Sequence, residues 1–390
     1  MKIAVFTDAF SPQVNGVVTH LNGSLPLLAK KHSIQVFAPQ ISKKYPKELI
    51  HKNIVITTYQ GIPVLVYQDV LFTSPYYQSV YEKIVEFQPD VIHVHTPFTM
   101  GANGVIAAKR LNIPLVQTFH TYVNEPEYLR HLQLHKIGMD KSALVQKGVW
   151  AFLELFYGPA DVIICPSEMT ARDLAQRFPD KKVVTISNGV PLKDRVLKRS
   201  RPFKGDYFVY VGRASVEKNI NVLIDAFVAS GLAEKSVSLV IVGKGPYLNE
   251  LKKYARQVEA AQSIIFAGEL PHKKVMTSGL LHGALAFVSA STSETQGITF
   301  LEAMAAGLPL IVAESKATTG LIDHNGIVCG AYDARAFSKA MIRLYANAAL
   351  RKKYGALSRI NAKKHNINTT VALLEKAYSN AIFLHAHPGS

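Results

Sequence analysis

Short runs of apolar residues alternate with longer stretches of mixed polarity along the whole chain. The apolar runs predict buried strands, and the stretches between them predict helices with one apolar face. The strand-like runs are Ile3–Phe6, Ile34–Ala38, Val91–His95, Leu115–Phe119, Val162–Cys165 and Val183–Ser187, followed by Tyr207–Val211, Ser238–Val242, Ile264–Ala267, Ala286–Val288 and Leu310–Val312. Strands that alternate with helices predict an α/β fold with parallel sheets covered by helices on both faces.

A polar, basic and proline-containing segment, residues 191–206, separates the two series of strands. We interpret it as a linker between two doubly wound domains, residues 1–190 and 207–350. The remaining residues, 351–390, are expected to form helices that pack back onto the first domain. A chain of 390 residues is long enough for two such domains with substantial cores.

Glu294 and Glu302 stand eight positions apart in a polar, glycine-bearing loop that runs into a short helical stretch. The first turn of a helix has unpaired N–H groups and the positive end of the dipole, which suit a diphosphate. Carboxylates accept paired hydrogen bonds from the hydroxyls of a ribose or a hexose. Because the apolar runs Leu285–Val288 and Leu310–Ala313 flank this segment, it lies at the carboxyl edge of a sheet, where such folds bind ligands. The pattern predicts a nucleotide-sugar site, although a glutamate pair is usually only a solvated helix face.

Two cations follow the first strand of the second domain. Arg213 and Lys218 lie five positions apart across a loop, so they can converge on one diphosphate, the arginine with two hydrogen bonds and the lysine as a compact charge. The alternative is a pair of solvated surface cations. No Asp-x-Asp element occurs in the sequence, so we expect neither a metal ion nor another cofactor, and the two cations take the place of the metal.

Other candidate residues also follow strands. Gly16 permits close backbone approach after the first strand, and Gly243 forms a similar turn in the second domain. His120 ends a strand of the first domain. His93 and His95 end another and share one face of it, because side chains alternate along a strand. For His93 and His95 a structural role is favoured.

Together these motifs resemble the retaining GT-B glycosyltransferases of family 4. The wording Ser293-Glu294-Thr295-Gln296-Gly297 is most similar to that of bacterial diacylglycerol glucosyltransferases, and more loosely to phosphatidylinositol mannosyltransferases. The resemblance implies two Rossmann-like domains that face a central cleft. It implies a catalytic role for His120, Arg213, Lys218 and Glu294, and donor binding by Gly16, Arg213, Lys218, Gly243, Leu270, Glu294, Thr295, Gln296, Gly297, Ile298 and Glu302. Pro191 replaces the acid of the family's Asn-Gly-Val-Asp turn.

The resemblance also implies a reaction. A hexose, foremost glucose from UDP-glucose, moves to a membrane lipid such as 1,2-diacylglycerol, with front-face attack and retained configuration. Phosphatidylinositol and a soluble or polysaccharide acceptor are the alternatives within the family. Leu270 is expected beside the nucleobase.

Net charge points to an anionic partner. The formal charge is +16 and the sequence pI is about 9.6. An anionic membrane surface is favoured over a merely basic enzyme, and a nucleic-acid-binding module is disfavoured because no recognition motif for it occurs. The aromatic stretch Trp150–Tyr157, with Lys136, Lys141 and Lys147 nearby, fits either a bilayer-facing helix or, preferably, a core helix. Without a membrane-spanning run, a signal peptide or more than two cysteines, we expect a cytoplasmic protein at the inner face of the cell membrane.

Overall fold

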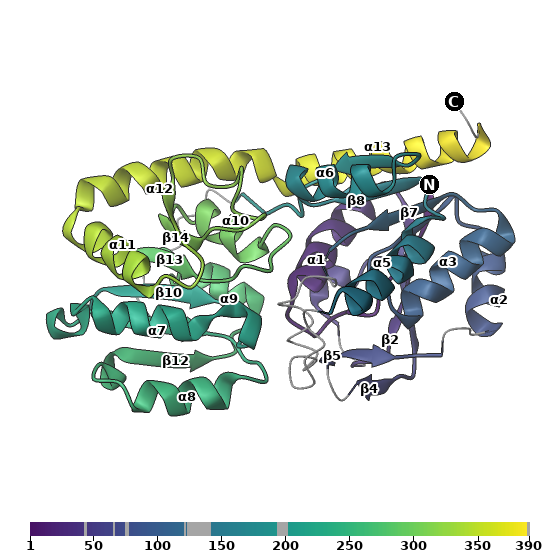
Figure 1. The fold of residues 1–390 in the computed structure, drawn as a ribbon. Coiled ribbons are helices and arrows are strands. Elements are labelled where there is room, and N and C mark those ends of the chain that lie inside the picture. The colour runs from purple at the N-terminus through teal and green to yellow at the C-terminus, as the bar shows by residue number, and fades with distance from the viewer. Residues whose placement is uncertain are drawn as a thin grey trace. The chain divides into compact units, whose positions relative to one another are not determined.

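The computed structural model describes residues 1–42, 45–64, 67–74, 78–120, 122, 142–192 and 202–387. The chain forms two compact units, of which unit 1 comprises Met1–Gly189 with Ile367–Ser390 and unit 2 comprises Val190–Asn366 (Figure 1). The segment 351–390 is therefore divided, because its residues up to Asn366 belong to unit 2. Most of the proposed linker, residues 193–201, lies outside the described residues.

Unit 1 is built on a parallel sheet of seven strands in the order β3-β2-β1-β6-β7-β8-β9. The strands are β1 (Lys2–Phe6), β2 (Ser33–Pro39), β3 (Ile54–Tyr59), β6 (Val91–Val94), β7 (Leu115–Thr118), β8 (Val162–Cys165) and β9 (Lys182–Thr185). A separate antiparallel pair consists of β4 (Ile62–Val64) and β5 (Tyr67–Phe72). Strand β3 was not predicted, because it lies at the sheet edge and is only partly buried, so its sequence lacks a continuous apolar run.

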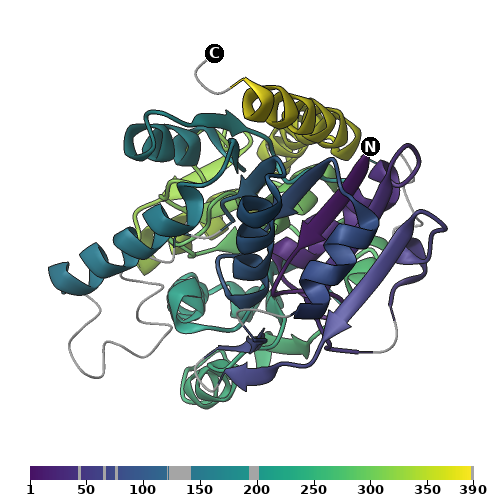
Figure 2. The same cartoon turned by 90° about the vertical axis from the view of Figure 1, so that its right-hand side faces the viewer.

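Alternating side chains of β1 divide unit 1 into two layers. Ala4 and Phe6 pack into the same core as α2 (Gln78–Phe87), α3 (Thr99–Leu111) and α5 (Ala143–Tyr157). Ile3 and Val5 point to the other face, which α1 (Gly16–Leu28) and α13 (Ile367–Ala386) cover. Helix α13 lies against α1, so the end of the chain completes this layer of unit 1 (Figure 2). The helix α6 (Glu168–Arg177) joins β8 to β9.

Unit 2 repeats the plan with six parallel strands in the order β12-β11-β10-β13-β14-β15. They are β10 (Tyr207–Val211), β11 (Ser238–Val242), β12 (Ile264–Gly268), β13 (Ala286–Ser289), β14 (Leu310–Ala313) and β15 (Gly326–Cys329). Phe208 and Tyr210 face α7 (Ile220–Ala229), α8 (Leu248–Arg256) and α11 (Ala334–Ala346), whereas Tyr207 and Val209 face α9 (His272–Thr277) and α10 (Ile298–Ala305). Helix α12 (Ala348–Ala362) packs against α10.

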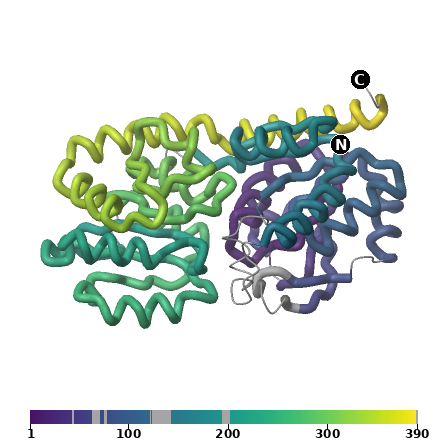
Figure 3. The backbone as a smooth tube through the Cα atoms, in the orientation of Figure 1, coloured from purple at the N-terminus to yellow at the C-terminus, as the bar shows by residue number. Residues whose placement is uncertain are grey.

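The prediction of two doubly wound α/β domains is confirmed, as the backbone trace of each unit shows (Figure 3). In each sheet the strand order reverses once, between β1 and β6 in unit 1 and between β10 and β13 in unit 2. Crevices at the carboxyl ends of such strands are where open α/β sheets bind ligands. Among the described helices, none combines the length and the apolar character that a bilayer crossing requires.

Candidate active site

Several of the predicted residues follow the strands at which each sheet reverses, whereas His120, Gly243 and Leu270 follow neighbouring strands. Gly16 and His95 come after β1 and β6 in unit 1, and Arg213 and Glu294 come after β10 and β13 in unit 2. The sequence motifs thus form two half-sites, which are described separately.

In unit 2 the structure brings together two predicted residues from different loops. Nζ of Lys218 lies 2.6 Å from Oε1 of Glu294 and 3.3 Å from Oγ of Ser291, which in turn donates to the same carboxylate oxygen at 3.2 Å. The lysine and glutamate side chains are 16% and 24% exposed, so the pair is partly shielded from solvent. Lys218 ends a short 3-10 turn, and the left-handed Asn219 after it starts α7. A diphosphate that meets this lysine must share it with Glu294.

Arg213 lies on the loop immediately after β10 and is partly buried. The Tyr210 hydroxyl donates to the Arg213 carbonyl oxygen at 2.9 Å and so holds the loop against the sheet. Burial raises the pKa of Tyr210 well above its usual value, and Glu294 and Glu217 raise it further, so this hydroxyl stays a donor. Arg213 and Lys218 therefore lie on one anchored loop, as the motif requires.

Gly243 allows the loops after three neighbouring strands to approach closely. Its φ is +141°, and a Cβ at this position would lie 1.8 Å from the Gly212 carbonyl oxygen. Its N–H donates to the carbonyl of Gly268 at 2.8 Å. Only glycine fits both the backbone angle and the space. The predicted turn is therefore present, and it draws the Arg213 loop toward the end of β12.

Gly297, immediately before α10, is a second position at which only glycine fits the backbone angle and the space. Its φ is +74°, and a Cβ would lie 2.7 Å from the Phe300 ring. Helix α10 begins at Ile298, and Thr295 and Gln296 before it are buried. The predicted loop-to-helix junction thus exists, with the N–H groups of its first turn at the carboxyl edge of the sheet.

The second glutamate of the motif has a different partner from the first. Glu302 lies in α10 and is 4% exposed, and its Oε1 is 2.5 Å from Nε2 of His272 in α9. Leu270, two residues before that histidine, packs partly buried against the same apolar cluster as α10. Glu294 and Glu302 therefore point to different groups, one toward a lysine and one toward a histidine. His272 was not identified from the sequence, because only the fold brings it to Glu302.

In unit 1 Gly16 is the first residue of α1, and Asn15 before it accepts a hydrogen bond from the Val18 N–H at 3.0 Å. Asp8, which the sequence analysis did not single out, ties this loop to α3. Its buried carboxylate accepts from the Met100 and Gly101 N–H groups at 2.6 and 3.1 Å. The pKa of Asp8 is raised, because the effect of burial exceeds that of these hydrogen bonds, which act in the opposite direction.

His120 belongs to a cluster of four histidines. Its Nε2 lies 3.1 Å from Nδ1 of His95, and the His95 ring lies 3.9 Å from that of His93. The fourth member, His20, has its ring 5.6 Å from His120. The sequence analysis missed His20, yet the spacing from Gly16 to His20 is one helical turn, which was a usable signal.

The structural role favoured for His93 agrees with its contacts. Nδ1 lies 2.9 Å from the Tyr378 hydroxyl of α13, and Nε2 lies 2.7 Å from Oγ1 of Thr118. Burial lowers the pKa of all four histidines, that of His93 to about 3, and the neighbouring rings lower those of His93, His95 and His120 further. At neutral pH the cluster is therefore uncharged, and His95 contacts His120 as a neutral ring.

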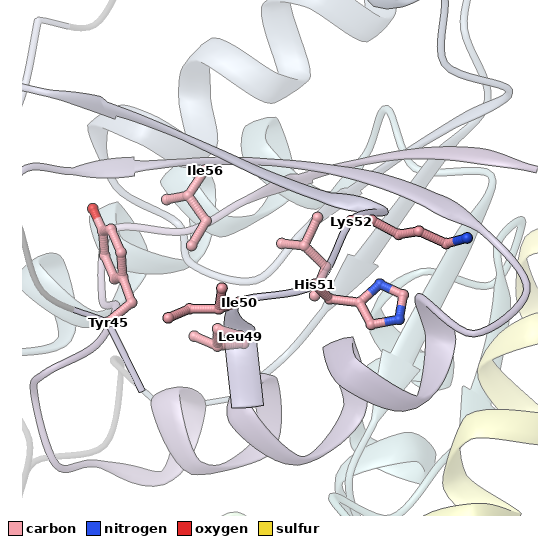
Figure 4. Close-up of a pocket in the computed structure, with 7 residues that line it drawn as sticks. Tyr45, Leu49, Ile50, His51, Lys52 and Ile56 are labelled. Atoms are coloured by element: carbon pink, nitrogen blue, oxygen red, sulfur yellow. The ribbon is translucent and has the colours of Figure 1, made fainter. Parts of the chain in front are cut away.

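Within the described part of the chain, no group of three or more His, Cys, Asp or Glu side chains is arranged to hold a metal ion. A separate hollow of about 390 Å³ lies beside the edge strand β3 (Figure 4). It is lined by Tyr45, Leu49, Ile50, His51, Lys52, Ile54 and Ile56. None of the predicted site residues belongs to it, so it is distinct from both half-sites.

The chain is similar to known glycosyltransferases over most of its length. The family model described as Glycosyltransferase Family 4 matches residues 14–194, and the one described as Glycosyl transferases group 1 matches residues 195–360. An alpha-monoglucosyldiacylglycerol synthase of Streptococcus pneumoniae is 32% identical, over 83% of this chain and 73% of its own length. A protein of the same name from Acholeplasma laidlawii is 30% identical, over 84% of each chain.

More distant proteins are similar in sequence or in fold. A GDP-mannose-dependent alpha-mannosyltransferase of Corynebacterium glutamicum is 27% identical, over 85% of this chain and 78% of its own length. Among solved structures, the Anabaena protein HepE in complex with UDP-glucose superposes with a TM-score of 0.74, covering 97% of this chain and 99% of that one. At 17% identity this similarity establishes the fold alone.

Proposed function

The chain is a hexosyltransferase that belongs to the GT-B glycosyltransferases of family 4, and we propose that it moves glucose from UDP-glucose to diacylglycerol at a membrane. The observation that carries the proposal is the similarity, over most of the chain, to two proteins named as monoglucosyldiacylglycerol synthases. The geometry of unit 2 supports a nucleotide-sugar donor, because two cations, two carboxylates and a helix start follow the central strands of one sheet.

We propose the following reaction at these groups. The diacylglycerol hydroxyl attacks the anomeric carbon of the glucose on the face from which UDP departs. The bond between that carbon and the phosphate oxygen breaks, and the hydroxyl proton passes to the leaving diphosphate. Arg213, Lys218 and the first N–H groups of α10 stabilise the negative charge that develops there. His120 of unit 1 contacts the transferred sugar in this scheme.

The proposal that the enzyme meets an anionic membrane rests on charge and on one helix. Lys and Arg together number 44 against 28 Asp and Glu. In α5, Leu144, Phe152 and Leu155 are 80%, 47% and 78% exposed, whereas Leu153 on the opposite side is buried in the core. Helix α5 is thus both a core helix on one face and an exposed apolar surface on the other. Lys136 and Lys141, which precede it, lie outside the described residues.

Incubation of the purified protein with radiolabelled UDP-glucose and diacylglycerol liposomes, with and without anionic phospholipid, tests the proposal. Labelled glycolipid that increases with anionic lipid is the expected result. Hydrolysis of UDP-glucose without transfer would retain the donor and exclude diacylglycerol, so soluble acceptors would follow. If neither reaction occurs, UDP-glucose is the wrong donor. GDP-mannose is then the next donor, because a relative is named for its dependence on it.

A further inference from the structure

The contact between Glu302 and His272 joins two helices of the donor half-site. Nε2 of His272 lies 2.5 Å from Oε1 of Glu302. An ionised carboxylate can only accept hydrogen bonds, so Nε2 of the histidine carries the proton. The pair joins α9 to α10, and the segment that contains Leu270 leads directly into α9.

The two ends of this pair differ in exposure. The Glu302 side chain is 5% exposed, and that of His272 is 41% exposed. His272 donates a hydrogen bond to Oε1, and among the described residues no side-chain hydrogen bond to Oε2 accompanies it. One carboxylate oxygen is therefore fixed by the protein, and the other is left for a ligand.

We propose that His272 is a positioning residue of the donor site, which holds Oε1 of Glu302 so that Oε2 accepts a hydrogen bond from the ribose of the nucleoside diphosphate. This inference rests on the proposed use of a nucleotide-sugar donor. Without His272 the carboxylate is free to rotate about its last side-chain bonds, and its orientation toward the ribose is lost. His272 acts through Glu302 and takes no part in the chemical step.

Apolar packing holds α9 against α10 without the help of the His272–Glu302 pair. Val275 of α9 is buried in the same apolar cluster as Phe300 and Leu301 of α10. The two helices are thus held together independently of the polar pair. Removal of the imidazole should therefore leave the helices in place and change mainly the direction of the carboxylate.

Two substitutions test whether a donor at the position of Nε2 is needed or whether any polar side chain is sufficient. In His272→Gln the terminal amide can reach the position of Nε2 and donate to Glu302, whereas in His272→Asn the side chain is too short. Lys273→Gln, an exposed change on the same helix, is the control. The probes are UDP and 2′-deoxy-UDP, whose dissociation constants are measured by calorimetry, together with kcat and KM for UDP-glucose.

We expect His272→Asn to weaken UDP binding and to raise the KM for UDP-glucose by about tenfold, with kcat changed much less. Its preference for UDP over 2′-deoxy-UDP should shrink, because the oriented acceptor for the ribose is lost. His272→Gln should retain most of the UDP affinity and most of the preference for UDP over 2′-deoxy-UDP. Lys273→Gln should behave as wild type.

Unchanged UDP affinity in a folded His272→Asn protein would overturn the inference, as would equal losses in the Asn and Gln variants. Because UDP binding needs no acceptor, these results are independent of the lipid. Failure of the wild-type protein to bind UDP would instead contradict the proposed donor.

Discussion

Nζ of Lys218 lies 2.6 Å from Oε1 of Glu294, although the two residues belong to loops that follow different strands. Ser291 contacts both groups and completes the arrangement. The motif residue expected to neutralise a diphosphate is thus itself neutralised by a second motif residue. Each side chain fixes the other, which prepares the lysine for a ligand without leaving a buried charge alone.

Replacement of Lys218 by Met should lower both stability and activity, and a second substitution should recover only the stability. The single change leaves Glu294 without its cation and should lower the free energy of unfolding by about 1–3 kcal/mol. Adding Glu294→Gln removes the second charge and should recover much of that loss. Transfer should stay reduced by about 100-fold or more in both proteins, because the leaving diphosphate lacks its cation.

Chemical unfolding and transfer assays of the two variants check this. Lys244→Met is the control, because its partner Glu269 lies 2.7 Å away in an exposed pair that should contribute at most about 1 kcal/mol. Wild-type transfer by the double variant would show that Lys218 is only a structural partner of Glu294.

Gly297→Ala should damage the start of α10. The left-handed φ of +74° and the Phe300 ring at 2.7 Å leave no room for a methyl group. We expect a loss of about 1–3 kcal/mol in the free energy of unfolding and a higher KM for UDP-glucose. Gly148→Ala in α5 is the control, since its Cβ would meet nothing within 4 Å. That change should stabilise the helix by about 0.5–1 kcal/mol, and equal effects of the two changes would contradict this account.

The central strands of the two sheets could be predicted because they are buried on both faces and form continuous apolar runs. The edge strands β3 and β15 were not predicted, because they are only partly buried. The glycines at helix starts could be predicted because their chemistry is local. The pairing of His272 with Glu302 could not, since thirty residues separate them and only the packing of α9 beside α10 brings them together. The same holds for Tyr378, which reaches His93 from the far end of the chain. Side-chain contacts of this kind depend on tertiary geometry, which no local pattern encodes.

The histidine cluster predicts that unit 1 loses stability in acid. The pKa values of His20, His93, His95 and His120 are lowered by burial, so the folded protein binds fewer protons than the unfolded chain. The stability is present above the unfolded pKa of about 6.5 and falls below it, by about 1.4 kcal/mol per pH unit for each fully neutral histidine. For His93 the loss ends near its folded pKa of about 3. Asp8, whose pKa is raised by burial, gives an effect of the opposite sign.

Thermal unfolding from about pH 7.5 to about pH 5 measures this slope. His20→Asn is the informative variant, because its amide can still donate to the Asn188 carbonyl, which His20 Nδ1 contacts at 3.0 Å. As the pH falls, we expect the unfolding temperature of this variant to decrease less steeply than that of the wild type. A flat pH profile in the wild type would mean that the histidines take up protons in the folded protein over the same pH range as in the unfolded chain.

The exposed leucines of α5 lead to the last prediction. Leu144 and Leu155 are 80% and 78% exposed, and burying a leucine in the bilayer interface contributes on the order of 1–2 kcal/mol. Leu144→Gln and Leu155→Gln should each weaken binding to vesicles that contain anionic phospholipid by about tenfold, without a change in UDP affinity. The control is Ile360→Gln in α12 of unit 2, an aliphatic residue that is 55% exposed. Sedimentation with vesicles at two salt concentrations separates this apolar contribution from the basic charge, which salt screens. Equal binding by all three variants would exclude α5 as the surface that meets the membrane.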